Sequence, residues 1–265
     1  METWQLLVAL IQGLVEWLPI SSQGQTILFV YNLGAVPVDS LIALTVWLHL
    51  GTMFAVLARY PRDILSIISL RDRSMFRLLL VATIGTGIVG VPVYLVRKIA
   101  LAAVLGSRLN LVVGLFLLAT AAMLYTTRDR TQQPEVTDSN RMPTAKVALL
   151  TGLAQGLSIL PGLSRSGITV SSLLMQKVDK ETALKFSFLM SVPAVLGIFA
   201  LEFVTGDLAV ATVGLTDLLA MDVVAFCVGL ASMEALLRLS RKVSFWKLCV
   251  FIAGIAIAFG FPAFF

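Results

Sequence analysis

The chain has 265 residues, of which 58% are hydrophobic and 13% are charged, and its formal net charge is +5. A mean hydropathy of +0.94 excludes a soluble protein and indicates a polytopic membrane protein. The basic residues cluster in short loops between apolar runs, as in cytoplasmic loops, which argues against a nucleic-acid-binding role. We expect no removable signal peptide, because no basic region precedes a cleavable small-residue site.

Six apolar segments are long enough to cross a bilayer, whose hydrocarbon core needs about 20 residues per helix. They are roughly 38–59, 76–97, 108–127, 183–204, 217–238 and 245–264. Two longer apolar segments, 4–33 and 147–176, are interrupted in the middle by proline, glycine and several serines. Each is predicted to form a helix, a break and a second helix.

The positions of lysine and arginine predict whether the broken segments cross the membrane. If both are re-entrant, nearly all basic residues collect on one side, and only Arg97, Lys98 and Arg108 lie on the other. If one of them crossed fully, this asymmetry would largely vanish. We therefore expect two re-entrant hairpins in the cell membrane, with both termini on the outer side.

Matching residues recur in the two halves of the chain at a fixed spacing of 143 positions: Gln12 and Gln155, Ser21 and Ser164, Gly24 and Gly167, Thr26 and Thr169. We expect one integral membrane domain, 1–265, built from an internal repeat of 1–127 and 146–265 with a polar cytoplasmic linker at 128–145. Each copy holds three spans and one hairpin. Because three is odd, the second copy is predicted to be inverted, so that the polar clusters of the two hairpins face each other.

The first hairpin contains Glu16 and the second contains Arg165, and these are expected to be the only deep charges. An ionisable residue at that depth costs about 2.5–3.5 kcal/mol on insertion scales, so it indicates a function or a partner. A structural ion pair between the two is the simpler interpretation and is compatible with a functional site. Gln12 lies one helical turn before Glu16 and can orient the carboxylate or a bound ion.

Small polar residues follow the break in each hairpin, where a new half-helix presents unpaired backbone N–H groups that suit an anion. In the first hairpin they are Ser21, Ser22, Gly24 and Thr26. The second, PGLSRSGIT from Pro161 to Thr169, adds Arg165, whose planar guanidinium suits a phosphate. Each cluster alone could simply cap its helix. Two facing clusters with one arginine and one glutamate favour a phosphate site, and Glu16 indicates a metal ion or proton transfer.

Two polar features lie on the spans themselves. The sole histidine, His49, lies in an apolar span and is expected to be a packing residue rather than a ligand. Ser187 and Ser191, on the span after the second hairpin, either line the site or allow close helix approach.

At these residues the chain resembles the undecaprenyl pyrophosphate phosphatase family, also called the bacitracin-resistance family. Gln12 to Glu16 match the family's Glu/Gln-x-x-x-Glu pattern, and Leu18 to Ser22 with Gly24 match LPISS-Gly. Pro161 to Thr169 match Pro-Gly-x-Ser-Arg-Ser-Gly-x-Thr without a mismatch. The resemblance covers essentially the whole chain. It implies an all-α fold of about ten helices, six spanning and four forming two re-entrant helix hairpins, with an inverted-topology repeat, in agreement with the pattern above.

By position, the resemblance implies that Gln12 and Glu16 are the pair associated with catalysis and with a divalent cation, Mg²⁺ or Ca²⁺. It also implies that Ser22 is the nucleophile and that Arg165 binds the phosphate. Contacts to the diphosphate are expected from Gln12, Ser21, Gln25, Thr26, Gly162, Ser164, Ser166, Gly167 and Thr169.

One position departs from the family pattern, because Gln25 occupies the place of a histidine in many members. Glutamine does not accept a proton near neutral pH, so the usual serine–histidine pair is unavailable. The hypothesis is then that Glu16, directly or through a water, activates Ser22 or the attacking water. A divalent cation and Arg165 would neutralise the charge on the phosphoryl group.

We expect a polyprenyl diphosphate phosphatase that converts the undecaprenyl-type lipid carrier to its monophosphate and inorganic phosphate for recycling. Its partners would be this lipid and the surrounding membrane lipids, and the resemblance implies that the cavity opens to the outer face. The alternative is a non-hydrolytic polyprenyl-phosphate transporter, because facing broken helices in inverted repeats also form transporter sites.

Overall fold

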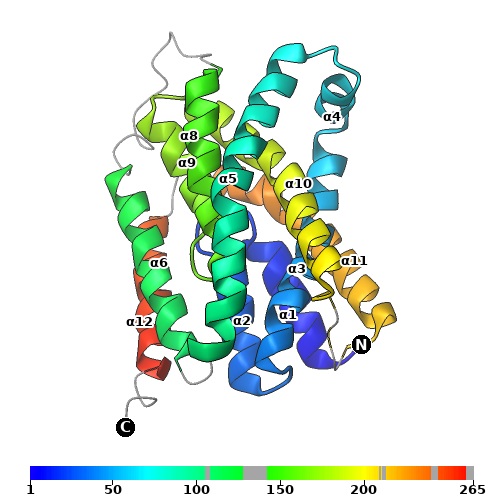
Figure 1. Cartoon of the computed structure of the whole chain (residues 1–265), viewed down its shortest axis with the longest axis vertical. Coiled ribbons are helices and arrows are strands. Elements are labelled where there is room, and N and C mark those ends of the chain that lie inside the picture. Colours follow the sequence, from blue (N-terminus) through cyan, green and yellow to red (C-terminus); the bar gives the residue numbers. More distant parts are fainter. Residues whose placement is uncertain (105–107, 128–141, 209, 211–212, 240–243, 261–265) are drawn as a thin grey trace.

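The computed structural model describes residues 1–104, 108–127, 142–208, 210, 213–239 and 244–260 (Figure 1). Every regular element in this part of the chain is a helix. Most of the predicted linker, 128–145, therefore lies outside the described residues. Its last residues precede and begin a helix.

Five helices are long and apolar enough to span a membrane: α3 (Val38–Arg59), α5 (Arg73–Val104), α6 (Leu109–Thr126), α10 (Lys180–Thr205) and α11 (Leu215–Leu239). They confirm five of the six predicted spans, and the chain is a multi-pass membrane protein. The sixth predicted span, 245–264, corresponds to α12 (Phe245–Gly260), an apolar helix of 16 residues. At 1.5 Å per residue it is about 24 Å long, shorter than a hydrocarbon core of about 30 Å. Residues 261–264 lie outside the described part.

Both interrupted segments form a helix, a break and a second helix, as predicted. The first consists of α1 (Thr3–Val15) and α2 (Ser22–Leu33). The second consists of α8 (Ala145–Gly156), the short 3-10 helix η1 (Leu157–Ile159) and α9 (Arg165–Met175). A short helix, α4 (Pro61–Ile68), was not predicted; it begins with proline at its first position, where the missing N–H has no helical partner to lose.

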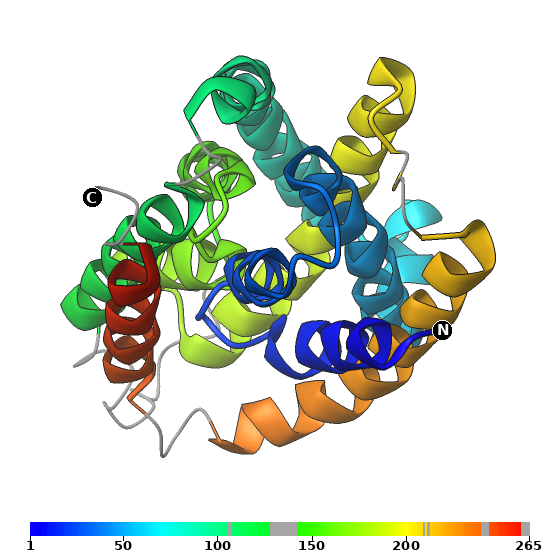
Figure 2. The same cartoon turned by 90° about the horizontal axis from the view of Figure 1, so that it is seen from below.

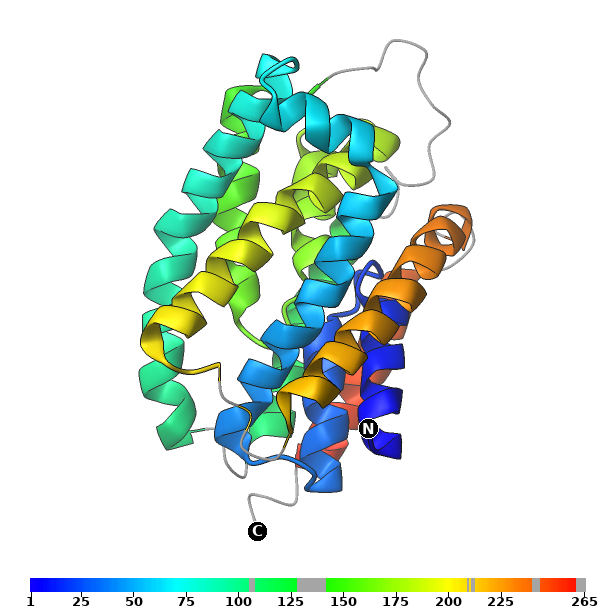
Figure 3. The same cartoon turned by 90° about the vertical axis from the view of Figure 1, so that its right-hand side faces the viewer.

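The two helix pairs approach each other from opposite ends of the molecule. In Figures 1 and 3, α1 and α2 occupy the lower half and α8 and α9 the upper half, and the two breaks meet between them. Helix α8 packs along α5, α1 packs along α11, and α3 packs against α10 and α11. Helices α6 and α12 pair at one edge, which is clear in the view from below (Figure 2). The breaks are thus enclosed by long helices.

Glycines allow the closest helix contacts, because small residues let two backbones approach. A Cβ at Gly13 on α1 would lie 2.8 Å from Val228 Cβ on α11. A Cβ at Gly156 on α8 would lie 2.7 Å from the backbone nitrogen of Gly90 on α5. These two glycines are 143 positions apart in the sequence, the spacing of the predicted repeat.

A Gly152→Ala substitution is expected to destabilise the fold by about 1–3 kcal/mol, the usual cost of overpacking. Its Cβ would lie 2.1 Å from the carbonyl oxygen of Ala82, so α8 would have to move away from α5. Gly87→Ala is the matched control on α5, since a Cβ there meets nothing within 4 Å. Thermal unfolding in detergent should show a lower Tm for the first variant only. Equal Tm values would contradict the α5–α8 packing.

Buried charges also occur outside the helix breaks, so the prediction that only Glu16 and Arg165 are deep is wrong. Arg97 on α5 and Glu202 on α10 form an ion pair of 2.7 Å with side chains 5% and 4% exposed. Asp222 on α11 is also buried. The pair can be buried because its opposite charges compensate each other. The two residues are far apart in the sequence, so the sequence alone does not show that they meet.

Candidate active site

The first break places a carboxylate and a hydroxyl side by side. Glu16 caps the end of α1, and its backbone N–H donates to the carbonyl oxygen of Gln12 at 3.0 Å. Ser21 caps the start of α2 with a left-handed backbone, φ 59°, and its Oγ accepts from the N–H of Gly24 at 3.2 Å. A non-glycine residue in this region stores about 1–3 kcal/mol of strain, which is common at functional sites. The turn leaves Ser22 as the first residue of α2, with its hydroxyl directed at Glu16.

The second break has the same construction. Ser164 caps α9, and its Oγ accepts from the N–H of Gly167 at 3.1 Å and lies 3.2 Å from Ser166 Oγ. Gly162 has φ 102°, a conformation that favours glycine. Thr120 on α6 supports this turn, since its Oγ1 accepts from the N–H of Ser164 at 3.1 Å and donates to the carbonyl oxygen of Gly162 at 3.2 Å. Thr120 was not predicted, because nothing distinguishes it within an apolar span.

The two breaks are in direct contact, which confirms that the two polar clusters face each other. The Arg165 guanidinium, at the first position of α9, donates through Nη2 to Glu16 Oε1. Ser166 Oγ donates to the carbonyl oxygen of Leu18 at 3.1 Å. A Cβ on Gly24 would lie 3.1 Å from Gly162 Cα, so the turns touch through their glycines.

The Glu16 carboxylate is the centre of this site and is 5% exposed. While Arg165 contacts Oε1, three groups surround Oε2. The hydroxyl of Ser22 donates to it at 2.5 Å, and Nε2 of Gln12 donates at 2.9 Å. Nε2 of His49 lies 3.4 Å away. Glu16 is thus positioned to receive the proton of Ser22 and to balance the charge of Arg165.

The other predicted contact residues lie around this centre. Thr169 Oγ1 bonds the backbone oxygen of Arg165 at 2.9 Å and Ser187 Oγ at 2.6 Å. Ser187 also offers its carbonyl oxygen to Arg165 Nη1 at 3.4 Å, so of the two interpretations of Ser187, lining the site is the one that the structure supports. Thr26 is buried, and its Oγ1 has no partner among the described residues.

Gln25 is directed at the backbone rather than at the carboxylate. Its Nε2 donates to the carbonyl oxygen of Ile20 at 3.0 Å, which closes the turn between α1 and α2. Its predicted contact with a diphosphate stays a prediction.

His49 is a neighbour of Glu16 that the sequence did not predict. We expected a packing residue, but its ring on α3 lies beside Glu16 and its Nδ1 is 2.5 Å from the carbonyl oxygen of Thr45. No sequence motif joins positions 16 and 49, so only the packing of α3 against the break of the first hairpin brings them together.

Comparison with known proteins shows the family of the chain. A family model described as "Bacitracin resistance protein BacA" matches residues 5–258. The chain belongs to this family. A protein from Methanothrix thermoacetophila named undecaprenyl-diphosphatase is 40% identical over 255 residues, covering 96% of this chain and 94% of that protein. One of the same name from Methanopyrus kandleri is 36% identical over 264 residues, covering 97% and 95%.

The residues of this BacA family member fit a hard divalent cation. Gln12 is fully buried, and its Oε1 has no hydrogen-bond partner among the described residues, although its amide lies against Glu16. One carboxylate with an amide oxygen matches the way Mg²⁺ is held by few protein ligands and completed by phosphate oxygens. The described residues contain no group of three or more histidine, cysteine, aspartate or glutamate side chains suited to a metal. Substrate oxygens would therefore complete the coordination.

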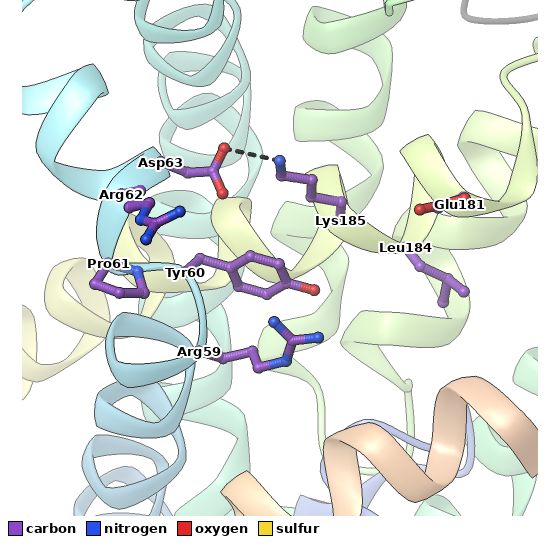
Figure 4. Close-up of a pocket in the computed structure, with 8 residues that line it drawn as sticks. All are labelled: Arg59, Tyr60, Pro61, Arg62, Asp63, Glu181, Leu184 and Lys185. Carbon is purple, nitrogen blue, oxygen red and sulfur yellow. Dashed lines mark hydrogen bonds and ion pairs between the residues drawn. The ribbon is translucent and has the colours of Figure 1, made fainter.

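A separate pocket of about 500 Å³ lies where α3, α4 and α10 meet (Figure 4). Two of the three basic side chains that line it contact carboxylates: Lys185 Nζ is 2.7 Å from Asp63 Oδ1, and Arg59 Nη2 is 3.2 Å from Glu234 Oε2. Burial raises the pKa of the Tyr60 phenol, so this side chain is neutral at physiological pH. None of the predicted site residues lines this pocket.

Proposed function

We propose that this protein is a membrane-embedded polyprenyl diphosphate phosphatase that acts on undecaprenyl diphosphate, with Glu16, Ser22 and Arg165 as its catalytic residues. The observation that supports this most is the contact of all three across the two helix breaks. Its membership of the BacA family and its relatives named undecaprenyl-diphosphatase give the substrate class. The product monophosphate would return the lipid carrier to use.

Ser22 is the nucleophile in the proposed reaction. As its Oγ attacks the terminal phosphorus, its proton passes to Glu16 Oε2, which already accepts the hydrogen bond at 2.5 Å. The P–O bond to the bridging oxygen breaks, and the lipid monophosphate leaves. The proton held by Glu16 passes to the leaving oxygen of the monophosphate, which returns Glu16 to its carboxylate form. Glu16 then takes a proton from the water that attacks the phosphoserine; the P–O bond to Ser22 breaks, inorganic phosphate is released, and the proton passes from Glu16 to Ser22 Oγ.

Binding of the diphosphate uses the starts of α2 and α9. Each presents backbone N–H groups at the end of a half-helix, and the positive end of the helix dipole favours an anion. Arg165 supplies the planar guanidinium that can contact two phosphate oxygens. Ser164 and Ser166 lie 3.2 Å apart beside it, and Ser21 and Thr26 lie on the opposite half-helix.

Glu16 and Gln12 would hold a divalent cation, Mg²⁺ or Ca²⁺. When bound, the cation neutralises phosphate charge and polarises the P–O bonds. The residues of the chain orient the diphosphate against Ser22, and α3, α6 and α10 surround the breaks.

The same proposal includes the membrane topology. We infer that α1–α2 and α8–α9 are re-entrant hairpins and that 1–127 and 146–265 form an inverted repeat with both termini outside, the linker 128–145 in the cytoplasm and the cavity open to the outer face. The contact pattern supports the repeat: α1 packs on α11 as its mate α8 packs on α5, and α6 pairs with its own mate α12.

The transporter alternative receives no support from the comparisons, since the relatives are named as diphosphatases. An assay with purified protein separates the two functions. Undecaprenyl diphosphate is supplied with Mg²⁺ or Ca²⁺, with and without chelator, and released phosphate is measured. We expect cation-dependent release. Flipping of a labelled lipid in proteoliposomes without phosphate release would support the carrier instead.

A Gln25→His substitution tests whether the missing histidine matters. Because Gln25 bonds Ile20 and Ser22 already has Glu16 as its proton acceptor, we expect kcat to stay within about tenfold, or about 1.4 kcal/mol, of wild type. The pH profile should not change its shape. A large gain in kcat, with an added inflection on the basic side of the pH profile, would show that Glu16 alone is not an adequate general base for Ser22.

A further inference from the structure

The orientation of the His49 ring is not explained by the proposed reaction. Its Nδ1 is 2.5 Å from the carbonyl oxygen of Thr45, four residues earlier on α3. A carbonyl oxygen only accepts, so Nδ1 carries the ring proton and the neutral ring has its lone pair on Nε2. That lone pair faces Glu16 Oε2 at 3.4 Å. A histidine whose second nitrogen donates to a backbone carbonyl has the usual arrangement of a metal ligand.

The distance between the two side chains also fits a shared cation. Hydrogen bonds between charged groups are shorter, about 2.7–2.9 Å. Two ligand atoms at about 2.1 Å from one metal, separated by about 90–110°, lie about 3.0–3.4 Å apart. The 3.4 Å between His49 Nε2 and Glu16 Oε2 lies at the upper end of this range.

Gln12 supplies a third donor atom. Its side chain is fully buried and Oε1 has no partner among the described residues. A buried acceptor left without a donor costs about 1–3 kcal/mol, which a cation would remove. Nε2 of the same carboxamide donates to Glu16 Oε2 at 2.9 Å, which keeps Oε1 beside the carboxylate.

We propose that His49 is a cation ligand and that its Nε2, Glu16 Oε2 and Gln12 Oε1 form the protein side of a divalent-cation site. Water or diphosphate oxygens complete the coordination, while Arg165 occupies Glu16 Oε1. An imidazole among oxygen ligands favours Mn²⁺ over Ca²⁺, because nitrogen suits transition metals. Only the coordination by diphosphate oxygens rests on the proposed phosphatase function. Cation binding by the protein residues is therefore tested without substrate.

Pulsed EPR with Mn²⁺ alone gives a direct readout on the full-length protein, purified with a tag that lacks histidine. The chain has one histidine, so hyperfine coupling from a metal-bound imidazole nitrogen can come only from His49. We expect this coupling in the wild-type protein and a change when histidine alone is labelled with ¹⁵N. His49→Gln should lose the coupling and bind Mn²⁺ at least about tenfold more weakly. Glu234→Gln, an exposed carboxylate exchange, is the matched control and should keep both.

Three outcomes would overturn the proposal: no Mn²⁺ binding, bound Mn²⁺ without imidazole coupling, or equal affinity in His49→Gln. The second is the result expected if His49 only forms an ion pair with Glu16. If His49→Gln fails to fold, the ¹⁵N experiment on the wild-type protein still decides. Imidazole coupling without phosphate release would contradict the phosphatase function and leave this site intact, and release without coupling would do the reverse.

Discussion

Replacing Arg165 with alanine is expected to lower kcat for phosphate release by about 10³-fold or more, the effect of losing an arginine that stabilises a transferring phosphoryl group. Arg165 contacts Glu16 and the carbonyl oxygen of Ser187, so it is held at the junction of the two breaks. Removing it also leaves the buried Glu16 without its main counter-charge. Steady-state kinetics on undecaprenyl diphosphate with purified protein measures the loss.

Two further variants show whether the loss of kcat comes from the guanidinium of Arg165 itself. Arg165→Lys keeps the charge without the planar fork and should recover only part of the activity. Arg59→Ala removes an arginine that is 40% exposed and paired with Glu234, and it should remain close to wild type, since such pairs contribute about 0–1 kcal/mol. Near-normal kcat in Arg165→Ala with a stable fold would exclude this arginine from the phosphate site.

Glu16→Gln and Ser22→Ala should each reduce kcat by about 10²–10⁴-fold, the range for loss of a positioned base or its nucleophile. Glutamine keeps the size of Glu16 but cannot take the Ser22 proton. Because the two side chains act as a unit joined by a 2.5 Å hydrogen bond, the double variant should be little worse than either single one.

Control variants are needed to distinguish a loss of catalysis from a loss of folding stability. Glu234→Gln and Ser69→Ala change an exposed carboxylate and an exposed hydroxyl and should retain activity and Tm. Strictly additive losses in the Glu16 and Ser22 double variant would contradict a direct proton transfer between them. Full activity in Ser22→Ala would show that Ser22 is not the nucleophile. The attacking group would then be a water activated by Glu16.

Most of the architecture that positions the site follows from the sequence. Hydrophobic length predicted five of the long helices, and the polar interruptions predicted both helix breaks. The fixed spacing between the halves of the chain predicted that Glu16 and Arg165 would meet, although they are far apart in sequence. Small residues at the breaks, such as Ser21 and Gly162, carry the backbone conformations that sharp turns require.

The features that the sequence did not predict depend on packing between helices. His49 and Thr120 lie in ordinary apolar spans, and only the contacts of α3 and α6 with the breaks make them part of the site. The pairing of Arg97 with Glu202 likewise needs two helix ends to meet. Gln25 matches a motif position, but the turn directs its side chain to Ile20, which a motif alone cannot show.

The most direct test of this account is the release of inorganic phosphate from undecaprenyl diphosphate by the purified protein, compared with a variant that combines Glu16→Gln, Ser22→Ala and Arg165→Ala. We predict release by the wild-type protein that stops on addition of a chelator, and none above background from the folded triple variant. No cation-dependent release by the wild-type protein, or full activity in the triple variant, would contradict the assignment of the site.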